Sequence, residues 1–262
     1  MSTRTRRTSL LTALVLTLAA SAALAQDADQ DKDFHWKGKL SAENVVFIKN
    51  VSGAIDAEAS SGDEVEVTAE KSGSHADEVS IKMVHLSDGV MFCAVYQGWY
   101  DDHCDGSHHN LGHSDNLKVH FTIKLPENLR FIAENVNGEV VAENLGRFVK
   151  ATSVNGKVRV STKAWAELTS VNGSLEARMG RSDWPGTLKL ETVNGSISVE
   201  LPNETNADVE FDSVNGHLRT EFPLTTQGSI DRHSIKGTIG AGGRELRVET
   251  VNGSVEIKRA SL

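Results

Sequence analysis

The sequence lacks the signatures of the common enzyme classes. Its 262 residues contain no phosphate-binding glycine loop, no G-x-S-x-G nucleophile elbow, no dinucleotide fingerprint and no H-E-x-x-H metal motif. Aromatic residues are scarce at 5%, and no strong amphipathic helical pattern follows residue 25. Glycine is frequent, with 22 residues, which is typical of turn-rich β structure. These absences favour an all-β protein without a standard nucleotide, hydrolase or metalloprotease site.

An excess of basic charge is also missing. The formal net charge is −9, and without the three arginines of residues 1–25 the chain keeps 24 basic and 36 acidic residues, a net charge of −12. Nucleic acids and anionic lipid surfaces attract proteins that carry basic patches. We therefore expect no nucleic-acid partner.

The apolar run Leu10–Ala20 is too short and wrongly flanked to span a membrane. Arginines precede it, and Ala23-Leu24-Ala25 forms an A-x-A cleavage site. This pattern predicts a secretory signal peptide over residues 1–25. The mature chain is then exported, periplasmic or extracellular, with no membrane span. Two consecutive arginines at positions 6 and 7 leave the twin-arginine route open as an alternative.

Cysteine is limited to Cys93 and Cys104. In an exported chain, an even pair most simply forms a disulfide, with two free thiols as the alternative. Cys104 falls in a His/Asp-rich segment, residues 97–116. Imidazole and carboxylate groups suit zinc, copper or nickel, although the spacing here matches no established motif. The candidate ligands are His103, His108, His109 and His113. The alternative is a solvated polar loop, and no cofactor is predicted.

What the sequence does contain is a repeat: the triplet Val-Asn-Gly occurs six times. Its corner residues are Asn137, Gly138, Asn155, Gly156, Asn172, Gly173, Asn194, Gly195, Asn215, Gly216, Asn252 and Gly253. Two relaxed copies, Val51-Ser52-Gly53 and Ile235-Lys236-Gly237, extend the series. Self-similarity at short spacing indicates one structural unit laid down repeatedly.

The residues around each glycine alternate with the period of a β-strand. Apolar residues stand seven and five positions before nearly every glycine, and two and four positions after it. Such spacing predicts strand, Asn-Gly corner, strand, with one face buried. Asn and Gly tolerate positive φ, which we expect the corner to need. Arg232 breaks the apolar column, so the copy at Gly237 is the least regular.

Two architectures fit these units. In a parallel β-solenoid (β-helix-like), successive corners stack about 4.8 Å apart, and stacked Asn amides bond along the ladder. In an antiparallel meander, each Asn-Gly is a hairpin turn. The solenoid is favoured because a meander gives no reason to keep the valine before each Asn-Gly.

The solenoid prediction divides the mature chain into three parts. Residues 26–39 form a lead-in whose Phe34 and Trp36 cover the open end. Residues 40–125 form an irregular first part with a hairpin at 79–86 and 90–96, and residues 126–262 form the regular repeats. The last repeat has no cap after it, so its edge, blunted by Lys258 and Arg259, is expected to pair with a partner strand or another copy.

The line Leu125–Leu129, followed by units of the form [ST]-V-N-G-x-[VIL] such as Ser153–Val158 and Thr250–Val255, resembles the bacterial DUF4097 family of adhesin-like proteins. The resemblance covers about residues 40–262. It implies an exported or envelope-facing β-solenoid without catalysis, and it transfers no site residues. The His/Asp-rich segment departs from the family pattern.

Three functions follow as hypotheses. The first is a non-enzymatic exported protein for adhesion, envelope structure or protein interaction, with an unknown protein or cell-surface partner. The second is metal binding by the His/Asp-rich segment. The third is a β-helix enzyme acting on polysaccharide, which needs carboxylates or basic residues gathered on one face. The outward positions show mixed charge instead: Lys157, Arg159, Glu176, Ser198, Arg219 and Glu256.

Overall fold

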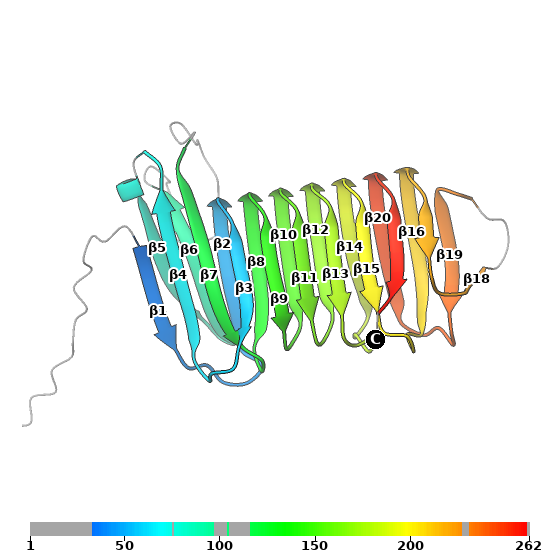
Figure 1. The fold of residues 1–262 in the computed structure, drawn as a ribbon, viewed down its shortest axis with the longest axis horizontal. Coiled ribbons are helices and arrows are strands. Elements are labelled where there is room, and N and C mark those ends of the chain that lie inside the picture. Colours follow the sequence, from blue (N-terminus) through cyan, green and yellow to red (C-terminus); the bar gives the residue numbers. More distant parts are fainter. Residues whose placement is uncertain (1–32, 75, 97–103, 105–115, 227–230, 261–262) are drawn as a thin grey trace, which may run out of the picture. The chain divides into compact units, whose positions relative to one another are not determined.

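The computed structural model describes residues 33–74, 76–96, 104, 116–226 and 231–260. The chain divides into two units, Met1–Gln30 and Asp31–Leu262, and every described residue belongs to the second. The predicted signal peptide lies outside the described residues. Where the chain is described, it is all-β apart from one 3-10 turn, η1 (Ala76–Glu78), as predicted (Figure 1). No helix in this part is long and apolar enough to cross a membrane.

The strands form two large, mostly parallel sheets. Sheet A contains, in spatial order, β1 (Asp33–Gly38), β4 (Val65–Ser72), β7 (Lys118–Pro126), β3 (Ile55–Ser60), β9 (Val140–Leu145), β11 (Val158–Thr162), β13 (Leu175–Met179), β15 (Ile197–Leu201), β21 (Val255–Arg259) and β17 (Leu218–Thr220). Sheet B contains β18 (Leu224–Thr226), β19 (Ser234–Ile239), β16 (Ala207–Asn215), β20 (Glu245–Asn252), β14 (Thr187–Asn194), β12 (Ala166–Asn172), β10 (Val149–Asn155), β8 (Arg130–Asn137), β2 (Val45–Ser52), β6 (Gly89–Tyr96) and β5 (Val79–Leu86).

Each corner joins a strand of sheet B to a strand of sheet A. The chain runs up β8, turns at Gly138 into β9, and returns as β10, which pairs with β8 in parallel. In the register of these strands Val149 lies beside Phe131 on one side and Ala166 on the other. The corners therefore do not join hydrogen-bonded neighbours, as the hairpins of a meander would, and the meander alternative is wrong for these strands.

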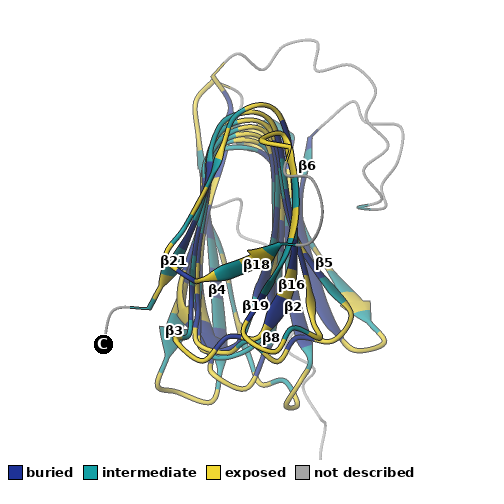
Figure 2. Cartoon of the chain, turned by 90° about the vertical axis from the view of Figure 1, so that its right-hand side faces the viewer, coloured by how far each residue is buried: buried dark blue, intermediate teal, exposed yellow. Residues whose placement is uncertain are grey.

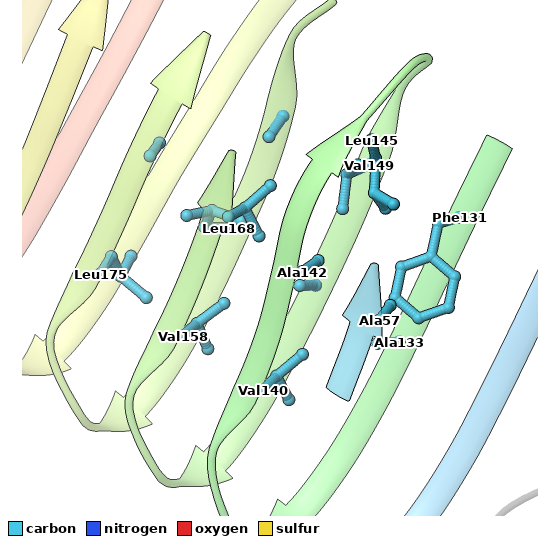
Figure 3. Packing of buried hydrophobic residues seen from close by; sticks show 14 of the residues in the cluster. Ala57, Phe131, Ala133, Val140, Ala142, Leu145, Val149, Val158, Leu168 and Leu175 are labelled. Atoms are coloured by element: carbon cyan, nitrogen blue, oxygen red, sulfur yellow. The ribbon is translucent and has the colours of Figure 1, made fainter. Parts of the chain in front are cut away.

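The core lies between the two sheets, and the repeat positions fill it. Phe131, Val149 and Leu168 point inward from sheet B, and Val140 and Val158 face them from sheet A (Figure 3). All five are 0% exposed. Buried and exposed residues alternate along the strands, so the sheets hold the apolar side chains between them and turn polar ones outward (Figure 2). The predicted alternation is confirmed.

The last repeat does not lie at the end of the stack. Strand β20 pairs with β14 on one side and β16 on the other, and β21 lies between β15 and β17. The chain thus leaves a gap between two coils and fills it with its final strands. Buried Trp184 marks the insertion, because its Nε1 donates to the carbonyl oxygen of Glu245 at the start of β20 (2.9 Å). The predicted free edge at Lys258 and Arg259 is wrong.

The relaxed copy at Ile235–Gly237 is not a corner either. It lies inside β19, which pairs antiparallel with β16, and Gly237 is opposite Val209. Strand β18 adds to β19, also antiparallel, and ends sheet B. The relaxed copy at Gly53 does form a corner, because its N–H donates to the carbonyl oxygen of Asn137. Arg232, the one break in the apolar column, was the sequence signal for this difference.

The other end of the stack is closed by antiparallel strands. The predicted hairpin is confirmed as β5 and β6, in which Leu86 pairs with Gly89. Strand β1 pairs with β4 at the end of sheet A. Its Phe34 and Trp36 pack against the core, with ring centroids 5.9 and 5.0 Å from that of Phe92. Both residues are partly buried, in keeping with the predicted covering role.

Candidate interaction surface

The corners line up as a continuous ladder of asparagine side chains. Nδ2 of Asn155 donates to Oδ1 of Asn137, and Nδ2 of Asn172 donates to Oδ1 of Asn155, each at 2.9 Å. The series continues through Asn194, Asn252 and Asn215 with donor–acceptor distances of 2.8 to 2.9 Å. Each interior amide is therefore both donor and acceptor. The predicted amide ladder is present, in the spatial order of the coils.

Glycine is required at the corners by close approach of the neighbouring coil. A Cβ on Gly156 would lie 2.0 Å from the carbonyl oxygen of Gly138, and one on Gly173 would lie 1.9 Å from that of Gly156. The expected positive φ is found at the corner glycines Gly53, Gly138 and Gly253, and the corner asparagines do not share it. Among the described residues only Glu43 and Asn144 combine a side chain with positive φ. Glycine is needed at the corner because its backbone packs directly on the glycine backbone of the neighbouring coil.

The residue three positions before each glycine has a role that the sequence reading missed. At four corners its hydroxyl points into the stack and donates to the glycine carbonyl of the neighbouring coil, as Ser153 does to Gly138 (3.0 Å) and Thr192 to Gly173 (2.9 Å). The buried Oγ of Ser213 has no partner among the described residues. Ser153 is 0% and Thr192 5% exposed. The recurrence of Ser or Thr before Val-Asn-Gly was the available signal, because a buried hydroxyl must find a partner.

Five of the six triplet valines point to solvent, and the sixth, Val136, packs against the core. Val154, Val171, Val193 and Val251 are 37 to 40% exposed, and Val214 is 61% exposed. They form a row beside the asparagine ladder, because adjacent coils are in register. Val214 is more exposed than the others because no further corner of the described chain lies beyond its coil, which follows the coil of Asn252 in space.

The outer face of sheet A neutralises its own charges. Arg159 and Glu176 are register partners, and their side chains form an ion pair at 3.0 Å. Lys157 reaches the same carboxylate at 2.5 Å. Hydrogen bonds from these two cations hold the pKa of Glu176 below its usual value. Farther along, Arg178 pairs with Glu200 at 2.9 Å.

The remaining outward positions complete this row. Ser198 follows Glu176, Glu256 follows Ser198, and Arg219 follows Glu256. A hollow of about 310 Å³ on this face is lined by residues of both signs, among them Glu143, Arg178 and Lys258. Because cations and carboxylates lie close together and form ion pairs, this face presents no field of one sign to a partner.

Sheet B carries an acidic row that the sequence reading did not find. Glu191, Glu249 and Asp212 are register neighbours on its outer face. Cations lie beside two of them: Lys189 is 3.8 Å from Glu191, and Arg247 pairs with Glu249. The described residues contain no group of His, Cys, Asp and Glu arranged to hold a metal ion. The row was missed because the order of β14, β20 and β16 in space differs from their order in sequence.

An apolar band lies along the opposite half of sheet B. Phe47 and Ile132 stand on the outer face of β2 and β8, and Phe148 and Trp165 stand directly before β10 and β12. Phe47 and Ile132 are register partners, and the rings of Phe148 and Trp165 lie 6.5 Å apart. All four are half-buried. Cations lie over the outer rings, with Lys49 Nζ 5.3 Å from the Phe47 centroid and the Arg181 guanidinium carbon 5.9 Å from that of Trp165.

The disulfide lies at one end of the apolar band. Cys93 is bonded to Cys104, with Cα atoms 6.0 Å apart, as predicted. Cys93 is the register partner of Lys49, whose Nζ donates to the carbonyl oxygen of Cys104 at 3.2 Å. The His/Asp-rich segment is therefore attached to the outer face of sheet B at Cys104. Its four candidate ligands, His103, His108, His109 and His113, lie outside the described residues.

A family model described as Toastrack DUF4097 matches residues 30–258. The chain belongs to the DUF4097 family. The match includes the irregular first part and all the corners, so the resemblance noted from the repeats holds over nearly the whole second unit. No curated protein matches the chain.

Solved structures similar to this DUF4097 chain come from bacteria. One, described as a "putative cell adhesion protein" of Clostridium sporogenes, is 13% identical over 87% of this chain and 100% of that chain, with a TM-score of 0.48. Another, a "putative adhesin" of Bacteroides fragilis, is 12% identical over 87% of this chain and 97% of that chain, with a TM-score of 0.38.

Proposed function

We propose that this DUF4097 protein is a non-enzymatic, exported β-solenoid that binds a protein or cell-surface partner in an adhesion role. The observation that carries the proposal is the apolar band on sheet B. Phe47 and Ile132 lie on the outer face of strands that are already hydrogen-bonded on both sides. Phe148 and Trp165 lie directly before β10 and β12 and stay half-buried, although Trp165 also packs against the core. Aromatic residues and arginine are enriched in protein interfaces relative to the rest of the surface.

The two faces of the stack differ in a way that supports this choice. On sheet A, cations and carboxylates pair within the protein. On sheet B, the apolar side chains of Phe47 and Ile132 are register partners on the outer face. Removing them from water when a partner binds contributes favourable free energy. The disulfide beside the band suits a protein of an oxidising compartment, which accords with export.

An enzyme acting on polysaccharide is the weaker candidate. The acidic row gives it one supporting feature, because three carboxylates lie side by side. A glycosidase needs a carboxyl group that stays protonated near neutral pH. Burial, or a neighbouring carboxylate with no cation beside it, raises the pKa of a carboxyl group in this way. Glu191 and Glu249 are instead about one-third exposed, and each has a cation on its own strand.

The proposal is tested by binding to bacterial envelopes immobilised on a sensor surface. The variant Phe148→Ser/Trp165→Ser removes one end of the apolar band. The control Lys189→Ser/Glu191→Ser changes the same face beyond the band. We expect the first variant to bind at least about tenfold more weakly, as loss of an aromatic hot spot does, and the control to bind like the wild type. Equal binding by both variants, or turnover of a polysaccharide by the wild type, would contradict the proposal.

A further inference from the structure

The six Asn-Gly corners are chemically alike but differ in how their backbones are held. In an Asn-Gly sequence, the glycine nitrogen can attack the asparagine side chain, since no glycine side chain hinders it. The attack needs that N–H free of other bonds and some freedom of the backbone. A hydrogen bond to the glycine N–H therefore protects the preceding asparagine.

Five of the six glycines are protected in this way. Gly138 N–H donates to the carbonyl oxygen of Asn155, and Gly156 N–H donates to that of Asn172. The bonds from Gly173, Gly195 and Gly253 follow the same rule, with donor–acceptor distances of 2.9 to 3.1 Å across the set. In every case the acceptor belongs to the next coil in space.

Gly216 is the exception because its coil is the last in the row of corners. Among the residues that the structure describes, none accepts a hydrogen bond from its N–H. The side chain of Asn215 donates to Asn252, but no described residue donates to its own Oδ1. The corner leads into β17, a strand of three residues that pairs with β21 alone.

We propose that Asn215 is a site of spontaneous deamidation, selected among the six corners by its place at the end of the ladder. The nitrogen of Gly216 attacks Cγ of Asn215, so an N–Cγ bond forms. The Cγ–Nδ2 bond breaks, and the amide leaves as ammonia, with the proton of Gly216 transferred to it. Water then opens the succinimide ring at either carbonyl and gives an aspartyl or isoaspartyl residue.

The reaction changes the end of the ladder. A carboxylate at position 215 has no N–H to donate to Oδ1 of Asn252, so two acceptor oxygens face each other. An isoaspartyl linkage also lengthens the backbone beside Gly216. The last coil therefore loosens, while the interior ladder from Asn137 to Asn252 keeps its bonds.

The test is peptide mapping by mass spectrometry of the full chain, aged in mildly alkaline buffer with and without denaturant. In the folded protein we expect Asn215 to convert at least about fivefold faster than each of the other five asparagines, as loss of one hydrogen bond allows. In denaturant the six rates should come within about twofold of one another, because local sequence alone then acts.

Asn137 distinguishes the effect of the side-chain amide bond from that of the hydrogen bond made by the glycine N–H. No described residue accepts from its Nδ2, yet Gly138 N–H is bonded to Asn155. It should therefore stay as slow as the interior corners. Conversion of Asn137 or an interior corner as fast as Asn215, or an advantage of Asn215 that persists unchanged in denaturant, would overturn the proposal.

Discussion

Asn252 donates a hydrogen bond from Nδ2 to Oδ1 of Asn194 at 2.8 Å, although the two residues are 58 positions apart in the chain. A complete copy of the triplet, at Asn215, lies between them in sequence. In space Asn215 lies on the far side of Asn252 and donates to it at 2.8 Å. The ladder is therefore continuous across a break in sequence order, and its stability depends on strands from the very end of the described chain.

The ladder should contribute measurably to stability. Asn172→Ala removes two amide hydrogen bonds, to Asn155 and from Asn194. We expect the free energy of unfolding to fall by about 1–2 kcal/mol. Asn137→Ala removes one bond, from Asn155, and should cost about half as much. Equal unfolding free energies for both variants and the wild type, from urea titrations, would show that the ladder is only a consequence of stacking.

The corner glycines should be intolerant of any side chain. The Cβ of Gly173→Ala would lie 1.9 Å from the carbonyl oxygen of Gly156, so the coils must move apart. We expect a loss of about 2–4 kcal/mol. Gly62→Ala is the matched control, because the nearest atom to its Cβ is Ser60 Oγ at 3.4 Å. Thermal unfolding that shifts equally in both variants would contradict the packing role.

Glu176 should report the charge pairing on sheet A. Lys157 and Arg159 depress its folded-state pKa, so its contribution to stability is present above its unfolded-state pKa. That contribution is lost as pH falls through the lower, folded-state pKa. An NMR titration should show the depression, and Lys157→Met should bring the pKa back toward its usual value of 4.5. A wild-type pKa at or above that value would contradict the pairing.

The His/Asp-rich segment is tested by calorimetry with Zn²⁺, Cu²⁺ and Ni²⁺. If the segment binds a metal, wild type should release binding heat that the variant His103→Ala/His108→Ala/His109→Ala/His113→Ala lacks. His85→Ala/His120→Ala is the control, because both histidines lie elsewhere on described strands. Identical heats for wild type and the fourfold variant would end the metal hypothesis.

The apolar spacing within each repeat was enough to predict the strands and the core, and the identity of the triplet across repeats was enough to predict the ladder. Ile48, Leu168 and Leu190 stand at equivalent positions, and each is fully buried. The inward-facing hydroxyl of Ser153 was not predicted, although its recurrence was visible. Its role depends on the neighbouring coil, and a single repeat does not show that coil.

The order of the coils could not be predicted, because the repeats are too alike. The triplets that contain Asn215 and Asn252 are identical, so local sequence does not choose which of them lies beside Asn194. Features outside the triplet make the choice. Trp184 bonds to the backbone of Glu245, and β19 occupies the far side of β16. The acidic row on sheet B escaped prediction for the same reason.

The most direct test of this coil order is a pair of double-cysteine variants. Neighbouring strands lie about 4.8 Å apart, which is within reach of a disulfide. Strands two coils apart are separated by about twice that distance, which is too far for one. Asn194→Cys/Asn252→Cys should cross-link on mild oxidation, and Asn194→Cys/Asn215→Cys should not, as read by peptide mapping. Cross-linking of the second pair and not the first would mean that the coils stack in sequence order, which would contradict the inserted position of the final repeat.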